Sequence, residues 1–202
     1  MSTGFQYIID KAATISINKR AVVAQSVSRD QTTRAVSRGG QVWRFDVAAP
    51  AGLVWAEARP NLEIIDSLDR FTPVQIQFSN TGYAWLLRYQ GTATTTQNWT
   101  ATWTKGSNQI FVSPQGFSGG NLLVAGDVIQ LAGGRVYTVA QTTTTGYVTL
   151  NRPVQEATGS GAVVIGPAVT WTVLCNAIPT WTIFNTNLVN FNGPFQFTES
   201  FA

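Results

Sequence analysis

The chain has 202 residues, of which 44% are hydrophobic and 11% charged, and its formal net charge is +3 at pH 7. It contains no histidine and one cysteine, so an internal disulfide is excluded and the residue spacing indicates neither a zinc site nor an iron–sulfur cluster. A free domain usually carries about 25% charged residues, so we expect other subunits to cover much of this surface; a neutral β domain that stays monomeric is the alternative.

Residues 1–50 predict a series of β-strands. Apolar and polar residues alternate in several segments, as Ile15 and Ile17 do around Ser16. The strand-like segments are FQYIID, ATISINKRAVVAQSVSRD, TTRAVSRG and QVWRFDVAA. Seven basic residues and two acidic residues precede residue 45, which gives 7 − 2 = +5, so the excess positive charge lies in the first quarter.

Three arginines of this quarter, Arg29, Arg34 and Arg38, are candidates for a subunit contact or for the lining of a lumen. Basic residues attract nucleic acid, but these are spaced apart, few stacking aromatics lie between them, and no nucleic-acid-binding motif accompanies them. Ion pairs between subunits are therefore favoured over direct DNA binding. A channel through which DNA passes and a solvated strand face remain as alternatives.

One helix is predicted over residues 60–69. Leu62, Ile65 and Leu68 recur at spacings of three, and Pro60 is acceptable in the first turn of a helix. Because a proline disfavours helical geometry at the preceding residue, Arg59 should lie in a turn.

The opposite side of this helix carries three acidic residues: Glu63, Asp66 and Asp69. Carboxylate pairs that perform acid–base chemistry need a pocket that separates their pKa values. The acidic residues instead follow the exposed stripe of an amphipathic helix. This pattern predicts a face that is solvated or meets a neighbouring subunit.

Strands are predicted again from residue 72. PVQIQFSNTGYAWLLRYQG is typical of a hairpin around residues 80–82, and Trp99, Ala101 and Trp103 share one side of a following strand. Residues 116–153 hold three apolar runs, separated by Gly-Gly at 133–134 and by a Thr/Gly cluster at 142–146. This order predicts a compact antiparallel meander of three strands.

The C-terminal part begins with AVVIGPAVTWTVLCNAI, which predicts two strands separated at Gly166-Pro167. The last strand, within FQFTESF, is expected to pair with the N-terminal half. The predicted fold is therefore all-β with one short helix: a split, tube-like β-barrel with an inserted small antiparallel β domain. Its three parts are residues 1–99 with the helix, the inserted residues 100–166, and residues 167–202, which return to the barrel.

Residues 105–165 carry a resemblance to a known family. GF, a run of small residues, AGDVIQL, a glycine turn into RVYTV and a strand that ends in LNRPV together resemble minor tail and baseplate proteins of tailed bacteriophages, of the distal tail protein type. The match is weaker over residues 55–70 and weakest over the first forty, and FQFTESF is similar to the C-terminal strand of that pattern.

The resemblance implies a structural protein of the virion. Its ring, usually of six copies with three possible, would extend the tail tube and join it to hub or spike proteins and to peripheral baseplate or fibre proteins. In such proteins the barrel forms the ring wall and the inserted domain projects outward.

An enzyme is not expected, because the chain has no nucleophile elbow, phosphate-binding loop or metalloprotease motif. Likewise we expect no cofactor, no metal and no small-molecule substrate. No apolar run has the length of a membrane helix and no secretion signal begins the sequence, so we expect no membrane partner and synthesis in the host cytoplasm.

A carbohydrate-binding β module of a receptor-recognition apparatus is the alternative function. Its candidate stacking residues are Trp99, Trp103, Trp171 and Trp181. Trp171 and Trp181 lie within apolar strands and are expected to be buried, which argues against this alternative.

Overall fold

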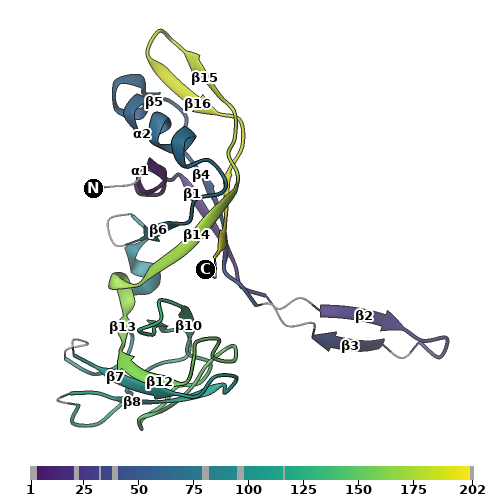
Figure 1. The fold of residues 1–202 in the computed structure, drawn as a ribbon, viewed down its shortest axis with the longest axis vertical. Helices are drawn as coiled ribbons and strands as arrows, with labels where there is room; N and C mark the ends of the chain where they lie inside the picture. The colour runs from purple at the N-terminus through teal and green to yellow at the C-terminus, as the bar shows by residue number, and fades with distance from the viewer. Residues whose placement is uncertain are drawn as a thin grey trace. The chain divides into compact units, whose positions relative to one another are not determined.

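The computed structural model describes residues 4–20, 23–31, 33–37, 41–78, 82–94, 98–115 and 117–200. This part of the chain is mostly β-sheet, which confirms the predicted all-β class, with two α-helices where one was predicted. The chain divides into two compact units (Figure 1). Unit 1 comprises Met1–Asp10 and Val74–Thr172, and unit 2 comprises Lys11–Pro73 and Val173–Ala202. In this division the inserted segment begins at Val74, before the predicted residue 100.

The main sheet of unit 2 is antiparallel and alternates buried and exposed residues along its central strands. Phe45, Val47, Phe195 and Phe197 point into the core and are at most 1% exposed. Four neighbouring strands of this sheet follow the order β1 (Thr14–Asn18), β4 (Arg44–Ala48), β17 (Phe195–Glu199) and β14 (Thr170–Ala177). The pairing of β17 with β4 agrees with the expectation that the last strand returns to the N-terminal half.

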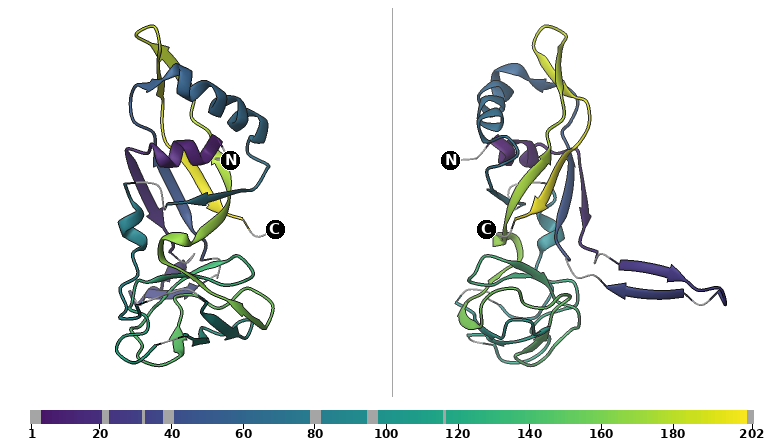
Figure 2. Two further views of the ribbon diagram at one scale, coloured as in Figure 1. Left: turned by 90° about the vertical axis from the view of Figure 1, so that its left-hand side faces the viewer. Right: turned by 45° about the vertical axis from the view of Figure 1, so that its right-hand side comes forward.

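A second sheet of unit 2 accompanies helix α2 (Trp55–Leu68). Its strand order is β15 (Trp181–Phe184), β16 (Leu188–Phe191) and β5 (Leu53–Val54). The helix lies beside the β15–β16 hairpin in Figure 2, and the Trp55 and Trp181 rings are 5.5 Å apart between centroids.

Helix α2 begins five residues before Pro60, so its predicted start at residue 60 is wrong. The buried residues Ala58, Leu62 and Ile65 recur at spacings of four and three, and this apolar face continues across the proline. Pro60 lacks a backbone N–H and therefore removes one internal hydrogen bond, yet the packing of that face outweighs this loss.

Helix α1 (Gly4–Asp10) replaces the strand predicted for FQYIID. Phe5, Ile8 and Ile9 are at most 1% exposed, a spacing that belongs to one face of a helix. The Gln6 side chain joins the helix to strand β6 (Val74–Gln77): its Nε2 donates to the Gln77 carbonyl at 2.7 Å, and its Oε1 accepts from the Gln77 N–H at 2.9 Å. Contacts 71 residues away in the sequence therefore stabilise α1.

The hairpin predicted after residue 72 is also corrected. Strand β6 is followed by the 3-10 helix η1 (Ala84–Leu87), and residues 80 and 81 of the predicted turn lie outside the described residues. Leu87 is buried while Trp85 is 68% exposed. The segment is therefore held by one buried side chain and lacks the alternating burial of a strand. The predicted break at Gly166-Pro167 is confirmed: η2 (Gly166–Ala168) separates β13 (Val164–Ile165) from β14.

Unit 1 contains two sheets that share one core. The four-stranded sheet has the order β11 (Tyr147–Thr149), β8 (Gln109–Ser113), β7 (Thr100–Trp103) and β12 (Gly159–Ala162). The three-stranded sheet has the order β10 (Val136–Thr138), β9 (Val128–Gln130) and β13 (Val164–Ile165). Both sheets contribute to a cluster that includes Trp99, Trp103, Val112, Ile129 and Tyr137.

The predicted meander is confirmed for its first two strands, and its third strand meets the second only through an antiparallel bridge between Val139 and Leu150. β9 and β10 form a hairpin through Gly133 and Gly134. Gly134 has a φ of 91°, a conformation that glycine adopts without strain. Along its length the third strand, β11, pairs with β8, and through that register Val148 joins the core. The strand orders of all described sheets are open, so the predicted barrel is not formed by the described pairings.

Candidate interaction surfaces

Strands β2 (Val23–Val27) and β3 (Thr33–Ser37) form a two-stranded ribbon, here called the arm, which pairs with no further strand among the described residues (Figure 1). Ser26 lies opposite Arg34 on one face, and Val27 lies opposite Thr33 on the other. Both faces are open to solvent: Val27 is 68% exposed and Val36 is 64% exposed.

The predicted arginine cluster maps to this arm in part. Arg29 lies in the turn, which is closed by a hydrogen bond from the Gln31 N–H to the Ser28 carbonyl at 3.0 Å, and Arg34 lies on β3. Both side chains are exposed, and Arg38 lies outside the described residues. Within the described part of the chain neither Arg29 nor Arg34 forms an ion pair, so their charges are available to a partner.

The predicted acidic residues lie on α2 and at its C-terminal end. Glu63 and Asp66 are exposed, and the N–H of the capping residue Asp69 donates to the Ile65 carbonyl at 2.8 Å. Asp69 pairs with the adjacent Arg70 at 3.4 Å. Asp66 lies in the last turn of α2, where the helix dipole disfavours negative charge, and this turn holds no basic residue that would compensate it.

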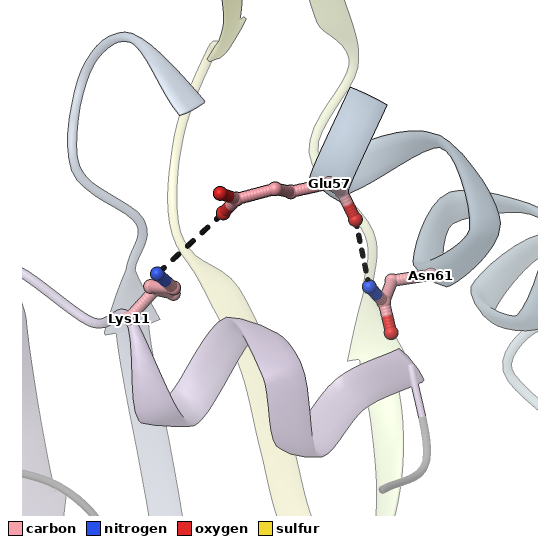
Figure 3. A network of polar contacts seen from close by, with 3 residues as sticks. All are labelled: Lys11, Glu57 and Asn61. Atoms are coloured by element: carbon pink, nitrogen blue, oxygen red, sulfur yellow. Dashed lines mark hydrogen bonds and ion pairs between the residues drawn. The ribbon is translucent and has the colours of Figure 1, made fainter. Parts of the chain in front are cut away.

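A small polar network occupies the first turns of the same helix (Figure 3). Lys11 Nζ lies 3.6 Å from Glu57 Oε2, and Asn61 Nδ2 donates to the Glu57 carbonyl at 2.9 Å. The Lys11 and Glu57 side chains are about half exposed, and ion pairs of this kind contribute at most about 1 kcal/mol. The network neutralises Glu57 but leaves Glu63 and Asp66 uncompensated.

Strand β15 forms an open edge of its sheet, and all four of its residues are exposed. Three of them are large and apolar: Trp181, Ile183 and Phe184, which are 36%, 49% and 38% exposed. A strand edge with unpaired backbone groups and apolar side chains is a surface on which another strand can pair. Trp181 was predicted to be buried, and that prediction is wrong because an edge strand is covered on fewer sides.

The tryptophans predicted to stack on sugar rings do not form an exposed platform. Trp99, Trp103 and Trp171 are 0%, 7% and 1% exposed and belong to cores, and Trp181 packs against Trp55. The burial of Trp171 is as predicted. A sugar ring has no access to the faces of the three buried indoles.

An aromatic pair that the sequence analysis did not identify lies on the outer face of the four-stranded sheet of unit 1. Phe111 and Tyr147 are 42% and 61% exposed, and their rings meet edge to face with centroids 5.1 Å apart. They border a groove of about 530 Å³. Phe111 sits between the buried Ile110 and Val112, and this alternation was the available signal.

The described residues contain no group of three or more cysteine, aspartate and glutamate side chains that could hold a metal ion. Cys175 is 1% exposed, and burial raises the pKa of its thiol to about 12. A thiol in this environment stays protonated and unreactive at neutral pH.

Among the described residues, no helix has the length and apolar character of a membrane span.

Comparisons with models of known protein families and with curated proteins found no match to this chain.

Proposed function

We propose that the chain is a structural component of a bacteriophage tail tip or baseplate. Copies of it assemble into a ring that extends the tail tube and joins it to hub and peripheral proteins. The assembly role rests on the arm, a two-stranded ribbon whose two faces are both exposed to solvent. The assignment to a phage tail is supported by the resemblance over residues 105–165.

The arm needs a partner to be ordered. An isolated two-stranded ribbon is at best marginally stable in water, because the ordering of its backbone costs about 1–2 kcal/mol per residue. Val27 and Val36 contribute little to offset this loss while they remain exposed. Covering each valine would contribute about 1.5–3 kcal/mol, so docking onto a neighbouring subunit stabilises the arm.

A closed ring requires two different patches on each subunit, each complementary to the other. The arm offers one patch, with Arg29 and Arg34 as its exposed cations. The outer side of α2, with Glu63 and Asp66, offers a patch of opposite charge. Pairing between these patches on adjacent copies would satisfy charges that have no partner within the described part of one chain.

The native mass of the purified chain tests this proposal. We expect analytical ultracentrifugation to show a species of six or three times the 21.9 kDa chain, and electron microscopy to show rings. Arg29→Glu with Arg34→Glu should abolish the rings and leave the circular dichroism spectrum unchanged. Arg88→Glu with Lys105→Glu is the matched control, because it reverses two exposed cations of unit 1 and leaves the arm intact.

Two results would contradict the proposal. A chain that stays monomeric at about 100 µM, a concentration far above the Kd of a stable subunit contact, would exclude self-assembly into a ring. Rings that form equally well from the arm variant would remove the two arginines from the contact.

A further inference from the structure

The groove on the outer face of the four-stranded sheet is built from a row of side chains that crosses all four strands. In register, Tyr147 of β11 lies opposite Phe111 of β8, Phe111 opposite Thr102 of β7, and Thr102 opposite Ser160 of β12. Thr104, Ser107, Gln109 and Thr158 line the groove beside this row.

The scaffold under the groove is closely packed. The inner face of the same strands carries Ala101, Ile110, Val112 and Val148, which are at most 2% exposed. Side chains on strands whose other face is packed keep their relative positions, which suits a binding site. Gly146 leaves room for the Phe111 ring, because a Cβ at this position would lie 2.6 Å from a ring atom.

The aromatic pair supplies an apolar surface in a polar surround. The edge-to-face arrangement of Phe111 and Tyr147 holds both rings in place while leaving 42% and 61% of these residues exposed. The C–H face of a pyranose ring is apolar and stacks on such rings, and its rim of hydroxyl groups remains free to bind neighbouring polar groups.

Hydrogen-bonding groups surround this surface, and the lining holds no charged side chain. Within the described part of the chain, the side chains of Thr102, Thr104, Gln109 and Ser160 have no hydrogen-bond partner. Hydroxyl and amide groups both donate and accept, as the hydroxyls of a sugar do.

We propose that this groove binds a neutral oligosaccharide, with one sugar ring on Tyr147 and Phe111 and its hydroxyls on Thr102, Gln109 and Ser160. The proposal goes beyond the assembly role and does not depend on it. Nucleic acid and anionic glycans are disfavoured because the lining contains no lysine or arginine. An extended peptide is disfavoured because the groove lies on a sheet face, over β7 and β8, which are already paired on both sides, whereas strand addition needs an open edge.

Isothermal titration with three neutral hexasaccharides tests the proposal: β-1,4-linked glucose, α-1,4-linked glucose and β-1,4-linked N-acetylglucosamine. We expect the full chain to bind at least one of them with a Kd in the millimolar range or tighter. Tyr147→Ala should weaken this binding about tenfold, and Phe111→Ala should weaken it similarly. Trp85→Ala is the matched control, because it removes a 68% exposed aromatic residue of the same unit outside the groove.

Thermal unfolding checks that each variant is folded. Absence of binding to all three hexasaccharides at about 10 mM would overturn the proposal. So would binding that persists unchanged in Tyr147→Ala, or self-association that only Tyr147→Ala abolishes. The arm variant Arg29→Glu with Arg34→Glu should bind the sugar as the wild type does, which separates the failure of this proposal from failure of the assembly role.

Discussion

The carboxylate of Glu199 accepts a hydrogen bond from the backbone N–H of Trp43 at 3.2 Å, and the Glu199 N–H donates to the Trp43 carbonyl at 2.8 Å. The two residues are 156 positions apart, at the end of the last strand and just before β4. Glu199 is 7% exposed, so hydrogen bonds from surrounding protein groups replace most of the contact of its carboxylate with bulk water.

Glu199→Ala should therefore destabilise unit 2, because it leaves the buried Trp43 N–H without this acceptor. We expect the free energy of unfolding to fall by about 1–3 kcal/mol. Glu199→Gln retains an acceptor oxygen and should cost less. Urea unfolding followed by tryptophan fluorescence measures both variants, and equal stability of Glu199→Ala and the wild type would contradict the assigned contact.

Replacement of Pro60 should stabilise the protein. Pro60→Ala restores a backbone N–H in the interior of α2 and should add about 1–3 kcal/mol, reduced by the greater freedom of the unfolded chain. Pro73→Ala is the control, because Pro73 is exposed and lies outside any helix. No gain in Tm for Pro60→Ala, or an equal gain for Pro73→Ala, would contradict the stabilisation expected from the restored N–H.

Asp66→Asn should have opposite effects on the stability of the monomer and on ring assembly. Removal of a negative charge from the last turn of α2 should raise the free energy of unfolding of the monomer by about 0.3–1 kcal/mol. The same variant should weaken ring formation in ultracentrifugation, if Asp66 faces the arm of a neighbour. Glu57→Gln should have the opposite effect on stability, because Glu57 lies in the first turn and pairs with Lys11.

Ionisation of Cys175 should lower the free energy of unfolding at alkaline pH. Burial raises the pKa of its thiol from 9.0 to about 12, so the folded state holds the proton more tightly than the unfolded state does. This contribution is fully present below pH 9.0 and is lost as the pH rises toward 12. Cys175→Ala should therefore lose less stability than the wild type between pH 9.0 and 12, and parallel pH profiles would contradict the burial of the thiol.

The folded thiol should also resist labelling. At about pH 8 a disulfide reagent such as dithionitrobenzoate should react with Cys175 only in denaturant, because the thiolate is the reactive form. Immediate labelling of the native protein would show that the strand β14 opens readily.

Local patterns in the sequence were sufficient for several elements. The alternation of Trp99, Ala101 and Trp103 correctly places these side chains on one side of the chain, and the glycine pair at 133–134 correctly marks a hairpin. Pro167 correctly separates two strands. In each case the deciding chemistry lies within a few residues, namely a side-chain period of two or a backbone angle that one residue type permits.

Elements that depend on distant partners could not be predicted in this way. FQYIID fits a strand or a helix, and the Gln6–Gln77 hydrogen bonds that accompany α1 join parts of the chain far apart in sequence. Similarly, the groove arises only when β11 pairs with β8, which brings Tyr147 beside Phe111. The facing of the arm arginines toward the acidic side of α2 on another copy stays a prediction.

The pairing of β4 with β17 has a consequence for synthesis on the ribosome. When residues 44–48 emerge, β1 is already available as a neighbour, but the other edge of β4 stays without its native strand until residues 195–199 are translated. A nascent chain that stalls before residues 195–199 are translated therefore exposes an apolar strand edge, and Phe45 and Val47 on this strand favour aggregation.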